Sequence, residues 1–210
     1  MPRSAARQAA VADLKRTLIL DAASAVFMRD GLDAASMRAI ARAAGYTAGA
    51  IYFHFDSKEA IYAALLERSL EALEAHTRAA AAAQADDRAA LRAAALAYFD
   101  FYERNPRDLD LGFYLFRGGM QPHGLGRERD RKLNARLLAA LEPLRAALLR
   151  LGVEAPRADA ETAAFFAHAS GLLLLRHTGR IKLFRAGAGE LLTAYLDDLA
   201  RRLNDLATAS

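Results

Sequence analysis

The feature that most constrains the fold is a pair of short helical patterns that meet at one glycine, within residues 36–55. Apolar side chains recur at helical spacing on both sides of Gly45, which predicts that they share one core. They are Met37, Ile40, Ala41 and Ala44 before the glycine, and Ile51 and Phe55 after it. Glycine can adopt a positive φ at the turn, and Ser36 and Thr47 can cap the two helices. The segment therefore predicts a helix-turn-helix, the unit that places its second helix in a DNA major groove.

The rest of the 210-residue chain is divided into further helices by glycine, proline and capping residues. Apolar residues make up 54%, and Ala, Leu, Arg and Glu favour helices, so we expect an all-α protein without strands. A first helix is expected over 11–29, with Leu14, Leu18 and Val26 on one face and Gly31 at its end. The other expected helices are 37–44, a short one after Thr47, 58–83 (capped by Ser57), 87–104, 106–117, 127–151, 157–178 and 188–205, with the longest loop at 118–126.

Composition excludes several classes of protein. The chain has no cysteine, so disulfides and thiolate chemistry are excluded, which fits a reducing cytoplasm. No stretch approaches the roughly 18 apolar residues that a membrane span needs, so we expect no membrane contact. The net charge of +4 is modest, and residues 1–58 carry most of the excess. Arg3 and Arg7 indicate a flexible basic N-terminal arm that can attract a polyanion such as DNA.

The helix-turn-helix segment and its flanks resemble the TetR family of bacterial regulators. The elements that carry the resemblance are Ile40-Ala41, Ala44-Gly45, the cap Thr47, Tyr52-Phe53-His54-Phe55 and Ser57-Lys58-Glu59. The preceding Ile19-Leu20 and the Phe27 to Gly31 stretch are also similar to the first helix of that family. The likeness covers about residues 16–62, and beyond it only the helical layout matches. Each element alone would be ordinary packing, whereas the whole set in this order favours DNA binding.

The resemblance implies DNA-binding roles for eight residues, namely Arg38, Thr47, Ala48, Gly49, Tyr52, Phe53, His54 and Lys58. Thr47 would cap the recognition helix and contact a phosphate. Tyr52, His54 and Lys58 would each contact a phosphate as well. Arg38 is the expected base contact, because a guanidinium can grip a guanine edge with two hydrogen bonds.

The remaining three residues offer no polar readout. Phe53 can touch a thymine methyl group or a sugar. Ala48 and Gly49, with Ala50 beside them, allow close approach but supply no hydrogen bonds. The recognition helix is therefore poor in polar readers, and DNA shape or the arm residues Arg3 and Arg7 can supplement it.

The resemblance divides the chain into a DNA-binding domain with its basic arm, 1–57, and a helical effector-binding and dimerisation domain, 58–210. Aromatic residues are frequent in the second domain. Most are expected to form a plain core, but a cavity for a small apolar or aromatic effector is also expected there. The candidate lining residues are Tyr102, Phe113, Phe116, Phe165 and His168.

The last two helices carry a broad apolar stripe. Such stripes normally pack inward within one chain, whereas the resemblance implies pairing with a second subunit. A symmetric dimer would suit a palindromic operator. The candidate interface residues are Leu172, Leu192, Tyr195, Leu196 and Leu199.

Sequence motifs of enzymes are missing. There is no P-loop, no Gly-x-Ser-x-Gly, no dinucleotide-binding glycine motif and no His-Glu-x-x-His. The five histidines lack close metal-ligand spacing, so neither a metal nor a cofactor is expected. The sequence thus predicts a cytoplasmic, homodimeric transcriptional repressor that releases operator DNA when its effector binds. The alternative is a helical small-molecule-binding protein of the same fold without sequence-specific DNA binding.

Overall fold

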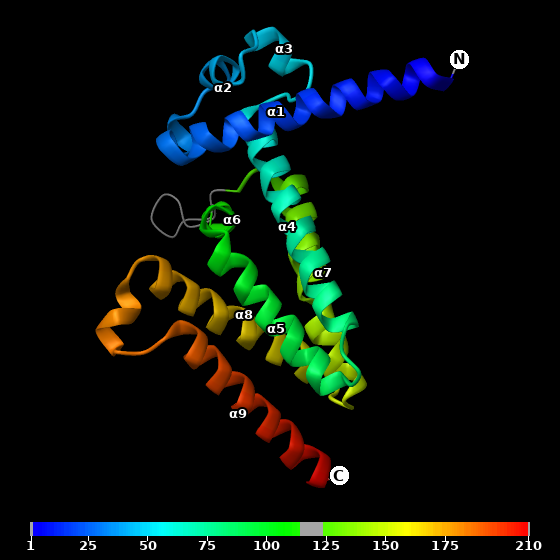
Figure 1. Ribbon diagram of the computed structural model, residues 1–210, viewed down its shortest axis with the longest axis vertical. Coiled ribbons are helices and arrows are strands. Elements are labelled where there is room, and N and C mark those ends of the chain that lie inside the picture. Colours follow the sequence, from blue (N-terminus) through cyan, green and yellow to red (C-terminus); the bar gives the residue numbers. More distant parts are fainter. Residues whose placement is uncertain (1, 114–123, 210) are drawn as a thin grey trace. The chain divides into compact units, whose positions relative to one another are not determined.

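The computed structural model describes residues 2–113 and 124–209. Within them every regular element is helical, as the sequence predicts (Figure 1). The elements are α1 (Pro2–Ala34), α2 (Met37–Ala44), α3 (Ala48–Tyr52), α4 (Lys58–Ala82), α5 (Asp87–Arg104), α6 (Pro106–Gly112), α7 (Arg127–Arg150), α8 (Ala155–His177), the 3₁₀ helix η2 (Arg180–Phe184) and α9 (Ala188–Ala209). The bounds of α2 and α5 are those predicted, and most other ends lie within a few residues of the prediction.

Two predicted elements are only partly described. The helix expected over 106–117 is observed as α6 up to Gly112, and residues 114–117 lie outside the described residues. Most of the loop expected over 118–126 lies outside them as well. The short helix η2 was not predicted, because five residues are too few to show a helical repeat.

Hydroxyl caps begin the helices around the glycine turn. The side-chain oxygens of Ser36, Thr47 and Ser57 accept hydrogen bonds from the amides of the third following residues, at 3.2, 3.3 and 3.1 Å. Such a bond satisfies an amide that the first helical turn leaves without a carbonyl partner. All three caps were predicted from the sequence and are confirmed.

The first helix differs from the prediction at both ends and on its buried face. It begins at Pro2, because the residues ahead of position 11 are mostly alanine, arginine and glutamine, which favour helix. Gly31, with φ 75° and ψ 168°, interrupts the helical backbone as expected. The face marked by Leu14 is solvent-exposed, with 61% of that side chain's surface accessible. The buried residues are Ile19, Leu20, Ala23, Val26 and Phe27, so Val26 of the predicted face is buried while Leu14 and Leu18 are not.

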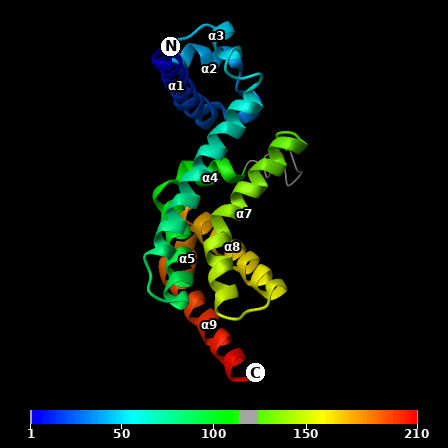
Figure 2. The same cartoon turned by 90° about the vertical axis from the view of Figure 1, so that its right-hand side faces the viewer.

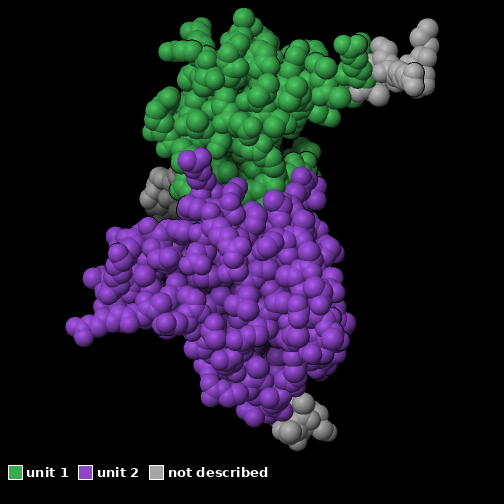
Figure 3. Space-filling model, in the orientation of Figure 1, with its two compact units in different colours: residues 1–69, 110–133 green, residues 70–109, 134–210 purple. Residues whose placement is uncertain are grey.

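The chain forms two compact units (Figure 3). Unit 1 contains residues 1–69 and 110–133, and unit 2 contains residues 70–109 and 134–210. α4, α6 and α7 each contribute to both units. The predicted division into 1–57 and 58–210 stays a prediction.

Each unit has its own core. In unit 1 the rings of Phe27 and Tyr62 meet edge to face at 5.2 Å, and the Tyr62 hydroxyl donates to the carbonyl of Leu111 at 3.1 Å. In unit 2 the buried Thr77 hydroxyl donates to the carbonyl of Ala140 at 2.8 Å, which ties α4 to α7. Within unit 2, α8 and α9 lie side by side (Figures 1 and 2). In the described ranges no helix is long and apolar enough to cross a membrane.

The positive φ of Gly45 gives a test of the turn. We expect Gly45→Ala to lower the free energy of unfolding by about 1–2 kcal/mol, because a Cβ is strained in the left-handed conformation. Gly49→Ala is the matched control, since Gly49 lies inside α3 and an added Cβ there meets nothing within 4 Å. Urea unfolding should find the control as stable as the parent or more so. Equal stability of Gly45→Ala and the parent would contradict the role of this turn.

Candidate nucleic-acid interface

The turn between α2 and α3 is built around Gly45, whose φ is 71° and ψ 26°. The amide of Gly45 donates to the carbonyls of Ala41 and Arg42, and the amide of Tyr46 donates to the Ala41 carbonyl at 2.9 Å. These bonds close the carbonyl end of α2 and turn the chain toward α3. The predicted role of the glycine is confirmed.

Burial under the two helices follows the sequence pattern. Met37, Ile40, Ala41, Ile51 and Phe55 are buried, as predicted, and Ala44 is half-buried. The guanidinium of Arg16, on α1, lies 4.3 Å from the centre of the Phe55 ring and covers it by a cation–π contact. The opposite sides of α2 and α3 are consequently left for solvent or a ligand.

The outer surface of α3 is mostly apolar. Thr47, Gly49, Tyr52 and Phe53 are exposed, while Ala48 and Ala50 are half-buried. Tyr52 has 55% of its surface accessible and Phe53 85%. The half-buried His54 ring packs edge to face against Phe53, with ring centres 5.3 Å apart. Within this surface, hydrogen-bonding side chains come only from Thr47, Tyr52 and His54.

The positive charge of this surface comes from α2. Arg38 and Arg42 are both exposed and lie four residues apart, so they share one side of the helix. Neither guanidinium forms an ion pair with a side chain in the part of the chain that the structure describes. Sequence reasoning chose Arg38 and missed Arg42, although the four-residue spacing was visible.

Lys58 is placed differently from the expectation. Its side chain is half-buried, and its ammonium donates to the backbone carbonyl of Asp33 at 2.7 Å. The bond joins the start of α4 to the end of α1. Nearby, Arg129 donates to both carboxylate oxygens of Asp56 at 3.1 Å, which fastens the start of α7 to the segment before α4. A phosphate contact by Lys58 would therefore have to share or replace an internal hydrogen bond.

Two of the five candidate effector residues are brought together around a third aromatic side chain, and the predicted effector site stays a prediction. Tyr102 and Phe165 are buried and both contact Tyr98, with ring centres 5.2 and 5.5 Å from its ring. Phe113 lies in unit 1, and Phe116 lies outside the described residues. Burial raises the pKa of the Tyr98 and Tyr102 hydroxyls, so both stay neutral at physiological pH. This cluster is a packed aromatic core, the alternative that the sequence left open.

His168 contacts a different tyrosine. Its ring stacks on Tyr195 of α9, with ring centres 4.4 Å apart. The His168 Nε2 atom is buried without a hydrogen-bond partner among the described residues. Burial and the nearby Glu161 carboxylate raise the pKa of Tyr195.

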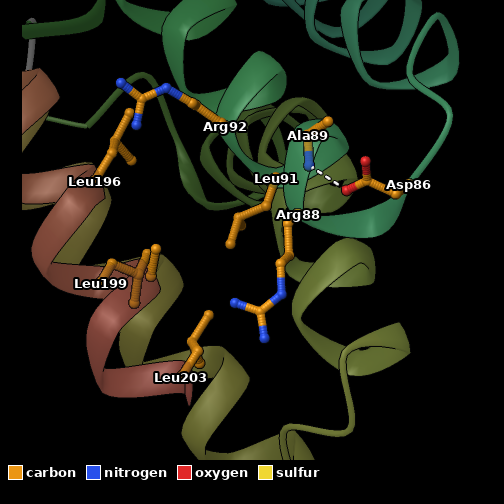
Figure 4. Close-up of a pocket in the computed structure, with 9 residues that line it drawn as sticks. Asp86, Arg88, Ala89, Leu91, Arg92, Leu196, Leu199 and Leu203 are labelled. Atoms are coloured by element: carbon orange, nitrogen blue, oxygen red, sulfur yellow. Dashed lines mark hydrogen bonds between the residues drawn. The ribbon is translucent and has the colours of Figure 1, made fainter. Parts of the chain in front are cut away.

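Three grooves of unit 2 are lined by residues other than the candidate effector residues. One of about 420 Å³ lies between the start of α5 and α9, where Leu91, Leu196, Leu199 and Leu203 face one another beside Arg88 and Arg92 (Figure 4). A second, of about 550 Å³, lies further along the same two helices. The third, also of about 550 Å³, lies between α7 and α8 and has the more apolar walls, including Leu137, Leu141 and Phe166. In the described ranges no three His, Asp or Glu side chains group closely enough to hold a metal ion.

The candidate dimer residues are mainly core residues of their own chain. Leu172, Leu192, Leu196 and Leu199 are buried within unit 2, and Tyr195 is half-buried. Their stripe packs inward because α8 and α9 contact each other and α8 also packs on α5. Little of these four side chains is exposed in the single chain, and the predicted dimer interface stays a prediction.

A different face of these helices is open. On α8 the exposed residues at helical spacing are small, namely Ala160, Ala164, Ala167 and Gly171, and they continue into Leu174. Leu191 and Ala194 are exposed apolar residues of α9. Leu183 and Phe184 of η2 are also exposed. The alanine and glycine spacing on α8 was visible in the sequence, but the leucine stripe drew the prediction away from it.

The sequence of the helix-turn-helix region is similar to sequences of known bacterial regulators. The model of the family described as bacterial regulatory proteins, TetR family, matches residues 19–65. The transcriptional activator FasR of Mycolicibacterium smegmatis is 41% identical over 101 residues, which are 48% of this chain and 46% of FasR. The repressor KstR2 of Rhodococcus jostii is 42% identical over 79 residues, 38% of this chain and 39% of KstR2. The matched regions thus span less than half the length of these curated relatives.

The fold extends beyond that region. The crystal structure of FadR from Bacillus subtilis superposes with a TM-score of 0.67 and 18% identity, covering 86% of this chain and 95% of FadR. Such a likeness concerns the fold alone, while the helix-turn-helix carries the sequence relationship. By residues 19–65 the chain resembles the TetR family of bacterial transcriptional regulators, and over most of its length it shares the all-helical fold of FadR.

Proposed function

We propose that the protein is a homodimeric regulator that binds operator DNA through α2 and α3 and responds to an apolar effector held in unit 2. The family is one of regulators and not of enzymes. The observation that carries the proposal is the capped α2–Gly45–α3 arrangement, which buries its apolar side and leaves Arg38, Thr47, Tyr52 and Phe53 outside. Such a regulator acts on chromosomal DNA and hence in the cytoplasm.

The proposed DNA contacts are of two kinds, hydrogen bonds to phosphates and contacts by the charged side chains of α2. Thr47 already accepts a hydrogen bond from Ala50, so its hydroxyl proton is free to be donated to a phosphate oxygen. Tyr52 and His54 are placed at the other end of α3 for the same purpose. Arg38 and Arg42 supply charge from α2, and Arg38 is our choice for a guanine edge. Lys58 adds a phosphate contact only where it gives up the Asp33 carbonyl.

The proposed dimer uses the small-residue face of α8 together with the exposed residues of α9. Small side chains allow two helices to approach closely. A two-fold axis through this face would make the interface self-complementary and present two recognition helices to two half-sites. The half-buried Tyr195, one of the residues chosen from the sequence, lies on α9 and remains a candidate contact.

The effector that we propose is apolar and chain-like. FadR from Bacillus subtilis, which shares the fold, was crystallised with stearoyl-CoA. Leu137, Leu141 and Phe166 line the groove between α7 and α8, with Glu142, Arg145 and Asp159 also among its lining residues. An acyl chain would need only apolar walls and few polar groups.

The direction of regulation that we propose is repression, relieved by the effector. A dimer seated over a promoter excludes polymerase without any further contact surface. The curated relatives include an activator as well as a repressor, so the direction needs its own test.

The Arg38 side chain gives the sharpest test of base reading. We expect Arg38→Ala to weaken operator binding by about 1–3 kcal/mol and to relax one base position per half-site. Arg42→Ala should weaken binding to every duplex alike. Arg104→Ala, which removes one exposed positive charge from unit 2, controls for net charge. Quantitative gel shifts on operator and random duplexes measure all three. Equal losses on both duplexes for Arg38→Ala would make it a phosphate contact.

The open face of α8 predicts the oligomeric state. We expect Ala167→Arg to convert the dimer to a monomer in analytical ultracentrifugation, because a guanidinium buried without a partner costs several kcal/mol. Ala167 is exposed in the single chain, so the variant should keep its helical circular dichroism. Ala135→Arg makes the same change at an exposed position of α7 and should leave the dimer intact. A dimeric Ala167→Arg protein would place the interface elsewhere.

The function as a whole is tested by titrating the protein–DNA complex. Gel shifts with DNA upstream of the protein's own gene should give a specific complex. Stearoyl-CoA should then weaken that complex by a coupling of about 1–3 kcal/mol, and free coenzyme A should not. A protein that is stabilised by stearoyl-CoA in thermal shift but binds no duplex specifically would be the helical ligand-binding protein without an operator.

A further inference from the structure

Phe53 is an unusual residue to leave in water. Its side chain is 85% accessible, although covering a phenylalanine is worth about 1.5–3 kcal/mol. The ring is nevertheless well positioned, because its backbone amide donates to the Gly49 carbonyl at 3.3 Å and His54 packs against its side. Phe53 is thus a fixed apolar surface at the end of α3.

Gly49 lies one turn before Phe53, on the same side of the helix. Its backbone has an ordinary negative φ, and a Cβ added there would meet nothing within 4 Å. Neither the conformation nor the packing of the chain therefore requires glycine. The open space around Gly49 would allow a group outside the chain to approach the backbone closely.

The apolar character of the surface around Gly49 and Phe53 indicates which kind of group it can bind. α3 itself, Ala48 to Tyr52, contains no amide, guanidinium or carboxylate side chain that could read a base by paired hydrogen bonds. An apolar ring beside an open glycine fits an apolar group instead. In the major groove the only such group is the C5-methyl of a pyrimidine, carried by thymine.

We propose that the surface formed by Gly49 and Phe53 reads a C5-methyl group in the DNA major groove, on thymine or equally on 5-methylcytosine. The proposal rests on the DNA-binding function proposed above and names the base feature that it recognises. A phenylalanine lying only against sugars would be insensitive to that methyl group, so the two arrangements can be separated.

The experiment begins with a duplex selected from a random library by the full-length protein. Each thymine is replaced singly by deoxyuridine, which removes only the methyl group. At one or more thymines per half-site we expect affinity to fall about fourfold, as the loss of one buried methyl group implies. In Phe53→Ala the same replacement should leave affinity unchanged. No sensitive thymine, or an undiminished sensitivity in Phe53→Ala, would overturn the proposal.

Two further arms sharpen the test. Replacing the sensitive T·A pair by 5-methyl-C·G should bind the parent protein more tightly than replacement by C·G, and Phe53→Ala should not distinguish the two. Gly49→Ala should fold as the parent does and bind the selected duplex more weakly, because its methyl group occupies the space of the base methyl. Unchanged binding by Gly49→Ala would contradict the close approach. Failure of the library to yield any specific duplex would instead refute the proposed DNA binding itself.

Discussion

The left-handed turn at Gly45 is the constraint on which the recognition surface depends. With φ at 71°, the chain leaves the path of α2 and re-enters a helix three residues later. Only this reversal allows Ile40 and Ile51, from two separate helices, to be buried in one small core. Once those apolar faces are buried, the orientation of α3 is fixed, and its opposite side must face outward. The binding surface is thus a by-product of packing, and its chemistry can vary without altering the turn.

Local signals made unit 1 readable from the sequence. A hydroxyl cap, a glycine at a positive φ and the repeat of a short amphipathic helix each act within four or five residues, so Ser36, Gly45 and Thr47 could be assigned without tertiary knowledge. The orientation of α1 could not be assigned in this way. Alanine, leucine and valine surround that helix almost evenly, and its buried side is determined by tertiary contacts, among them those with α2 and the contact between Phe27 and Tyr62.

In unit 2 the helices were predicted well, but their contacts could not be chosen from the sequence. Leu192, Leu196 and Leu199 form a stripe that normally packs inward and that the family resemblance assigned to a second subunit, and in the single chain all three are buried. Tyr102 and Phe165 were likewise chosen for a cavity but pack around Tyr98. A periodic apolar stripe predicts that one face of a helix is buried, but it does not identify the segment that packs against that face. That information resides in contacts between residues far apart in the chain.

The tether between Lys58 and the Asp33 carbonyl has a consequence for how the chain meets a polyanion. In a free regulator this ammonium is occupied, so each encounter with DNA begins from a state in which one cation is already satisfied. A phosphate contact by Lys58, as proposed above, would exchange one hydrogen-bond acceptor for another and would release the end of α1 from the start of α4. The gain from that contact would be reduced by the internal hydrogen bond that it replaces. Because phosphates carry no sequence information, this reduction would apply to operator and random duplexes alike.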